Sequence, residues 1–121
     1  MNVYDTANRL ASEIKSSEEY VNYKMAKQAI SLKQELKNEI EEFEKLRYQT
    51  QIHVMQTGKN DEEMLKKMQQ MYAKLIEQQE AKKYFDAENK FNILIADVNK
   101  IIGESVKDLL CLLYTSDAAD D

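Results

Sequence analysis

Residues 84–102 read YFDAENKFNILIADVNKII, and this stretch decides the fold class. Its apolar residues recur every three or four positions, which is the period of an α-helix with one buried face. They form two adjacent stripes, Phe91-Ile95-Val98-Ile102 and Ala87-Phe91-Leu94-Val98-Ile101. Because so wide an apolar face is more than one antiparallel neighbour covers, we expect this helix to lie centrally in a bundle or in a subunit interface.

The composition of the whole chain also favours helices. The 121 residues include two Gly and no Pro, so the residues that punctuate strands and tight turns are scarce. The chain is 43% hydrophobic and 32% charged, which suits helices with a wide polar face. The predicted fold is all-α: an elongated antiparallel bundle of four to five helices that includes a long helical hairpin. Since elongated hairpins expose apolar edges, we expect a homodimer or higher oligomer.

The expected helix boundaries follow from local signals. Three pairs have the spacing of a capping box, in which two side chains satisfy the free N–H groups at a helix start: Ser16 with Glu19, Ser31 with Gln34, and Asn60 with Glu63. Gly58 follows an apolar stripe and predicts a left-handed helix end. The polar run 77–83 predicts a bend between two helices, the alternative being one helix that continues through solvent.

Residues 111–121, CLLYTSDAADD, do not resemble native protein sequence. They match, residue for residue, the translation of the transposase adapter used in DNA library preparation; the alternative is a native tail that continues the last helix. We therefore expect residues 1–110 to be one native helical domain. Three of the 22 acidic residues lie in this tail, which leaves 19 against 17 Lys and Arg and turns a net charge of −5 into −2. The only Cys, Cys111, lies there too.

The same sequence predicts no catalytic, cofactor-binding or metal-binding residues. His53 has Gln49 and Thr50, not an acid, at the preceding helical positions, so the E-x-x-H spacing of a di-iron site is absent. Two glycines leave no phosphate-binding loop. Without a basic stripe interleaved with aromatics, a signal peptide or a long apolar run, we expect neither direct nucleic-acid binding nor a membrane segment, and we expect a cytoplasmic protein.

Two sets of residues are the candidates for protein contacts. The expected subunit interface consists of Tyr84, Phe85, Phe91, Leu94, Ile95, Val98, Ile101 and Ile102. The expected partner-binding residues are Met64, Met68 and Met71, because flexible Met side chains adapt to varied partners. The alternative for the methionines is the inner face of a helical bundle.

Three motifs, taken in order, resemble the YlbF/YmcA/YheA family of small cytoplasmic helical proteins from Gram-positive bacteria. The motifs are Tyr4-Asp5-x-Ala7-x-x-Leu10, Ser17-Glu18-Glu19-Tyr20 and Ala87-Glu88-x-x-Phe91-x-x-Leu94-Ile95-x-x-Val98-Asn99-x-x-Ile102. The resemblance covers nearly all of residues 2–110. The compact length is most similar to the YheA-like branch.

The resemblance implies an all-α, dimer-forming protein without catalysis of its own. In this family YlbF and YmcA act with a third protein that influences ribonuclease activity and a phosphorelay behind competence, sporulation and biofilm formation. Their cysteine-held iron–sulfur clusters do not carry over, because residues 1–110 contain no Cys. The resemblance thus implies a regulatory or adaptor protein whose partners are proteins, related family members among them. A prefoldin-like helical chaperone is the alternative, suggested by the Met64 to Met71 stripe.

Overall fold

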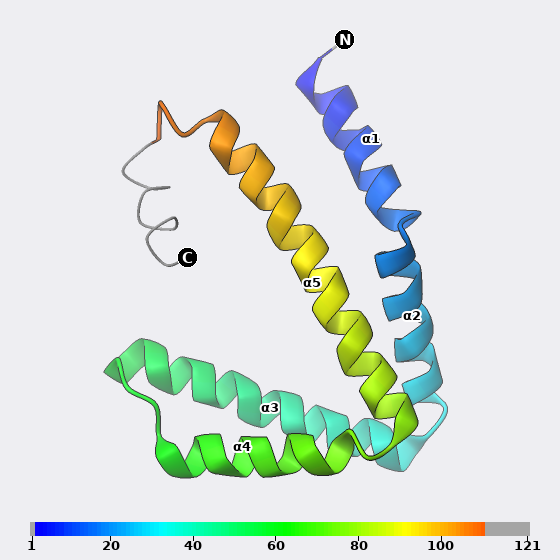
Figure 1. Cartoon of the computed structure of the whole chain (residues 1–121), viewed down its shortest axis with the longest axis vertical. Coiled ribbons are helices and arrows are strands. Elements are labelled where there is room, and N and C mark those ends of the chain that lie inside the picture. The colour runs from blue at the N-terminus through cyan, green and yellow to red at the C-terminus, as the bar shows by residue number, and fades with distance from the viewer. Residues whose placement is uncertain (1, 111–121) are drawn as a thin grey trace.

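In the computed structural model, the described residues, 2–110, form five helices and no strand (Figure 1). They are α1 (Val3–Lys15), α2 (Glu18–Ser31), α3 (Gln34–Thr57), α4 (Glu62–Leu75) and α5 (Gln79–Ser105). The all-α prediction and the expected number of helices are confirmed. The interpretation of residues 111–121 as an adapter translation, with Cys111, lies outside the described residues.

The five helices form two arms that meet at one end (Figure 1). One arm is the hairpin of α3 and α4. The other is α5 packed along α2, with α1 extending beyond α2. The helices therefore form two elongated arms that diverge from a common junction. They do not pack along one shared axis, as the predicted single antiparallel bundle would.

The buried core lies at the junction of the arms. Eight apolar residues from four helices form it: Ile30, Leu36, Ile40, Phe43, Leu75, Ala81, Tyr84 and Phe85. At its centre the Phe85 ring lies 5.3 Å from that of Phe43 and 5.2 Å from that of Tyr72, centroid to centroid. Because fully burying a large apolar side chain contributes about 1.5–3 kcal/mol, the junction rather than the arm tips stabilises the fold.

Two predicted helix breaks are confirmed. Gly58 ends α3 with φ 74°, a left-handed conformation that glycine adopts without the strain a Cβ would cause. The bend within 77–83 is also present, because α4 ends at Leu75 and α5 begins at Gln79. The Gln78 N–H donates to the Leu75 carbonyl at 3.0 Å and closes the turn between them.

The predicted capping residues are wrong in all three places. Ser17, not Ser16, caps α2 by accepting from the Tyr20 N–H at 3.2 Å, because the Ser16 N–H is still bonded to Ser12 within the last turn of α1. Ser31 donates to the Gln28 carbonyl inside α2, which leaves Lys33 as the uncapped start of α3. Asp61, not Asn60, caps α4: its carboxylate accepts two N–H groups at 3.0 and 3.1 Å.

Candidate protein interaction site

The apolar face of α5 is divided between the core and the surface. Tyr84 and Phe85, at its start, are buried in the junction of the arms. Phe91, Leu94, Ile95 and Val98 follow and are half-buried. Ile101 and Ile102, near the end, are 71% and 50% exposed. The first residues of the predicted interface are thus buried in the core of the same chain, and the last residues are exposed on its surface.

Phe91 marks the boundary between these two parts. Its ring lies 5.6 Å from that of Tyr23 and 6.1 Å from that of Tyr20, both on α2. These are distances at which aromatic pairs attract each other. Towards its C-terminal end, α5 diverges from the side of the molecule formed by α1 and α2, as Figure 1 shows.

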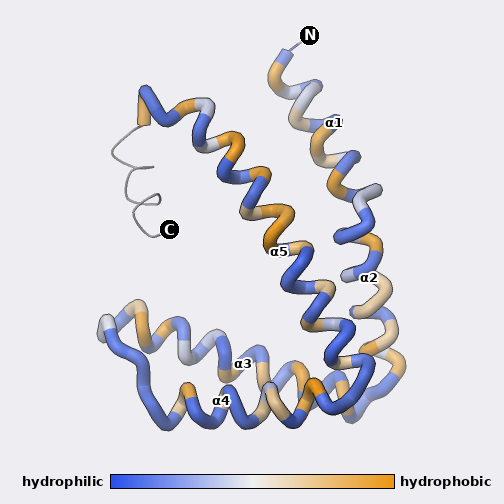
Figure 2. The backbone as a smooth tube through the Cα atoms, viewed as in Figure 1, coloured by the Kyte–Doolittle hydropathy of each residue, from blue (hydrophilic) through white to orange (hydrophobic). Residues whose placement is uncertain are grey.

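α1 presents a second uncovered apolar face at the same end of the molecule. Its apolar residues recur at helical spacing on one side, yet none of its residues is buried. Val3 and Tyr4 are 80% and 79% exposed, and Leu10 and Ile14 are half-buried. Figure 2 shows apolar segments along both α1 and the far half of α5. We call these two segments, residues 3–15 of α1 and 94–105 of α5, the open end.

The three methionines of the predicted partner-binding stripe lie on the α3–α4 arm. Met68 and Met71 are half-buried and pack against the core, which agrees with the inner-face alternative. Met64 is also half-buried and borders a shallow groove of about 310 Å³ near the tip of the hairpin. Its other lining residues come from α3: Tyr48, Gln49, Ile52, His53 and Gln56.

A cluster of polar side chains joins the two arms, and the sequence reasoning missed it. Arg47 of α3 donates to both carboxylate oxygens of Glu88 on α5, at 3.0 and 3.3 Å. The Tyr23 hydroxyl of α2 donates to the same carboxylate at 3.3 Å. Beside it, the Tyr84 hydroxyl donates to Glu44 at 2.5 Å. We call these five residues the clasp.

The electrostatics of the clasp make it a structural element. The hydrogen bond from Arg47 to Glu88 is the main cause that raises the pKa of Arg47. Burial, followed by the bond to Glu44, raises the pKa of Tyr84 above its ordinary value of 10.0. The hydrogen bonds of the clasp connect α2, α3 and α5 and so hold the two arms together.

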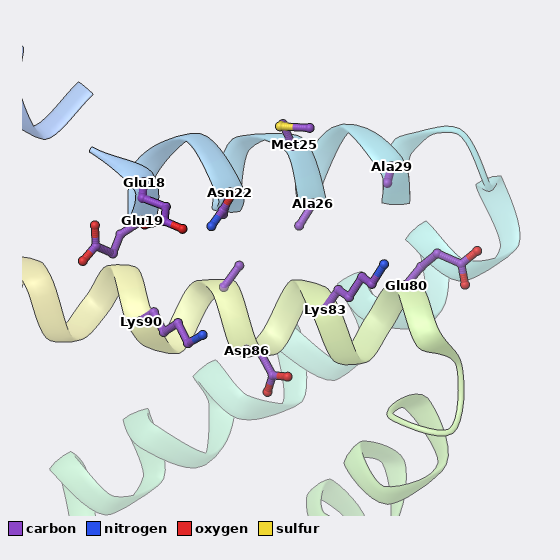
Figure 3. A pocket seen from close by; sticks show the side chains of 11 residues that line it. Glu18, Glu19, Asn22, Met25, Ala26, Ala29, Glu80, Lys83, Asp86 and Lys90 are labelled. Carbon is purple, nitrogen blue, oxygen red and sulfur yellow. The ribbon is translucent and has the colours of Figure 1, made fainter. Parts of the chain in front are cut away.

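A groove of about 700 Å³ follows the packed pair of α2 and α5 (Figure 3). Ala26 and Ala29 face α5 from the α2 side, whereas Asp86 points away from α2 (Figure 3). The remaining lining residues are Glu18, Glu19, Asn22, Met25, Glu80, Lys83, Ala87 and Lys90. A small-residue floor between mixed charges is typical of a helix-packing groove, and small-molecule pockets are more enclosed and apolar.

The described residues contain no group of three or more His, Cys, Asp or Glu arranged to hold a metal ion. His53 is half-buried on α3, and its backbone carbonyl accepts a hydrogen bond from the Thr57 hydroxyl at 2.8 Å. Within residues 2–110 no helix combines the length and apolarity needed to cross a membrane.

Fold and surface together define an all-helical protein whose amphipathic faces are only partly covered by the chain itself. Residues 3–107 match the family described as "Control of competence regulator ComK, YlbF/YmcA", and the chain belongs to this family. The resemblance found in the motifs is thereby confirmed.

Several relatives share this family and match the chain over most of its length. A UPF0342 protein from Clostridium novyi is 33% identical over 108 residues, which make up 89% of this chain and 95% of the relative. One from Symbiobacterium thermophilum is 33% identical, covering 86% and 93% of the two chains. One from Alkalihalophilus pseudofirmus is 34% identical, covering 89% and 92%. No solved structure matches the chain.

Proposed function

We propose that this protein is a non-enzymatic regulatory or adaptor protein that acts in the cytoplasm through helix-mediated contacts with other proteins. The family description links it to control of the competence regulator ComK. Competence, sporulation, biofilm formation and RNA processing are the processes in which we expect it to act. Its partners are a second copy of the chain and other proteins, related family members among them.

The open end carries this proposal. An isolated helix of 13 residues, the length of α1, is marginal in water, so tertiary packing must support it. Yet α1 buries none of its residues in the described chain. The matched stretch makes up 92–95% of the three relatives named above. Those relatives have little further chain to cover the same helices, which favours cover by another molecule.

We place the homodimer contact at this end. Ile101 and Ile102, with Val3 and Tyr4 on α1, offer large apolar side chains that a second copy would remove from water. Each such side chain contributes about 1.5–3 kcal/mol when it is fully buried. Burial of these side chains in both copies would favour association of the two chains.

Sedimentation velocity of the full chain tests the dimer and the adaptor surface together. Ile101→Asp should shift the protein toward the monomer with its helix content unchanged, because Ile101 makes no contribution to the buried core. Lys66→Asp, at an exposed position of α4 outside the open end, is the control for an added acidic residue and should leave the mass unchanged. A wild-type chain that sediments as a monodisperse monomer would argue against the proposal.

A prefoldin-like holdase is the second candidate. Large apolar side chains are exposed on both arms, with Met55 80% exposed on α3 and Ile101 71% exposed on α5. Exposed apolar surface of this kind suits the capture of unfolded clients. The purified chain should then bind an apolar dye and delay the aggregation of a test protein, and the absence of both effects would remove this candidate.

A further inference from the structure

We propose that the outer face of α3 near the hairpin tip is a second contact between copies of this chain, separate from the open end. In it the α3 helices of two copies lie antiparallel and cross close to Ile52. We call this face, which consists of Tyr48, Gln49, Ile52, Met55 and Gln56, the tip face.

The first observation is the absence of charge. Residues 48–58, YQTQIHVMQTG, are the longest run in the sequence without Asp, Glu, Lys or Arg, although 32% of the chain is charged. The solvent-exposed face of a helix usually carries charged residues. Charged residues are depleted at the centres of protein interfaces. The run therefore has the composition of an interface core.

The second observation is the exposure of its apolar residues. Tyr48, Ile52 and Met55 follow each other at spacings of four and three and so lie on one side of α3. Tyr48 is 64% exposed, Met55 is 80% exposed and Ile52 is half-buried. The shallow groove beside Met64 runs along the same side of the helix and contains no formally charged residue. Tyr and Met are among the residues enriched at interfaces.

The occupant that this face fits is a second copy of itself. A two-fold contact places the same patch on both sides, so any charge on the patch would meet a like charge. The tip face carries none. Antiparallel pairing about Ile52 brings Tyr48 within one residue of the level of Met55 of the other copy, an offset of about 1.5 Å that still allows a favourable sulfur–aromatic contact. Gln49 and Gln56 have the same one-residue offset, and an amide can both donate to and accept from another amide.

Cysteine cross-linking tests the geometry in the full chain with Cys111→Ser as background. Ile52→Cys places two thiols next to the two-fold axis, within the short reach of a disulfide. Glu41→Cys, exposed three turns earlier on the same helix, places them about 30 Å apart. Under mild oxidation the linked fraction of Ile52→Cys should exceed that of Glu41→Cys at least about fivefold. Equal or absent cross-linking of the two variants would overturn the proposal.

A second arm of this experiment separates the tip face from the open end. Adding Ile101→Asp to the Ile52→Cys chain disrupts the open end only, so the linked fraction should stay the same. A fall to the Glu41→Cys value would show that the thiols meet through the open end, and the tip contact would then be wrong.

Self-association in solution gives an independent measurement. Met55→Glu introduces a charge at an 80% exposed side chain, so the fold should be kept while two like-charged patches meet. Its dissociation constant, measured by sedimentation in the Ile101→Asp background, should rise at least about tenfold. Gln70→Glu adds the same charge at an exposed position of α4 and should leave the constant unchanged. Equal constants for the two variants would contradict the proposal.

Discussion

Arg47 of α3 and Glu88 of α5 form a bidentate ion pair, in which the two guanidinium nitrogens lie 3.0 and 3.3 Å from the two carboxylate oxygens. Their positions are 41 residues apart in the chain, and each belongs to a different arm. The Arg47 guanidinium also lies 5.5 Å from the ring centroid of Phe43, so the pair borders the buried core. This contact joins the α3–α4 hairpin to the arm that carries the open end.

Glu88→Gln should lower the free energy of unfolding by about 1–2 kcal/mol, because Arg47 loses a charge-assisted partner while it remains two-thirds buried. Urea denaturation at pH 7, followed by circular dichroism, measures the change. Glu13→Gln is the control, since its pair with Arg9 is exposed on both sides, and it should cost less than about 0.5 kcal/mol. Equal effects of the two substitutions would show that the clasp does not stabilise the junction.

Phe43→Leu should destabilise the chain by about 1–2 kcal/mol, and Phe43→Ala by about 3–5 kcal/mol, because the ring fills the centre of the core. Phe43 is only 4% exposed. Leu32→Ala, at an 86% exposed side chain, should change the stability by less than about 0.5 kcal/mol. Thermal or urea unfolding distinguishes them, and a small effect at Phe43 would place the core elsewhere.

Asp61→Ala should cost about 1 kcal/mol, because two N–H groups at the start of α4 lose their acceptor. Asn60→Ala should change the stability much less, since the Asn60 side chain does not cap α4. The comparison of the two urea midpoints tests which residue is the cap. A larger loss for Asn60→Ala would restore the prediction made from the spacing.

Tyr84 should make the fold sensitive to alkaline pH. Its pKa is raised in the folded state, so the unfolded chain loses the phenolic proton first, and the stability from Tyr84 is lost as the pH rises above 10. The loss amounts to about 1.4 kcal/mol per pH unit in that range. Tyr84→Phe, which cannot ionise, should be less stable than wild type at pH 8 and approach it by pH 11. A stability difference that stays constant from pH 8 to 11 would contradict this.

We further propose that residues 111–121 are not encoded by the native gene, because they match a translated adapter. Sequencing of the locus from an independently prepared library should show a different codon after that of Leu110. Genomic codons for Cys111 and the residues after it would make the tail native, and the net charge of −5 would stand.

Local sequence patterns predicted the breaks between helices but not the individual capping residues. Gly58 and the polar run 77–83 predicted their breaks correctly, because a left-handed conformation and the lack of an apolar stripe are properties of the residues themselves. The caps were each wrong by one or two residues. Neighbouring polar residues such as Ser16 and Ser17, or Asn60 and Asp61, are equally able to cap, and the backbone geometry of the turn selects between them.

The clasp could not be predicted from local sequence patterns, because its residues are far apart in the chain. Glu88 belongs to a motif used for the resemblance, yet no spacing rule connects it to Arg47 or Tyr23. The position of the charged residue Glu88 on the buried side of an amphipathic helix is the one indication that it has a partner, since buried charges are paired. Its partner is set by the angle between the arms.

The sequence alone determined the all-α class, a range of four to five helices, the main breaks and the apolar stripe of α5, because helical period, glycine content and proline content act within a few residues of the chain. Which part of that stripe is buried was decided only by the tertiary structure. Tyr84 and Ile101 both belong to the apolar side of α5, but Tyr84 contacts α2 and α3 at the junction and is buried, whereas Ile101, near the end of the helix, is 71% exposed. Burial depends on what packs opposite a residue, and helical periodicity identifies a face without identifying its neighbour.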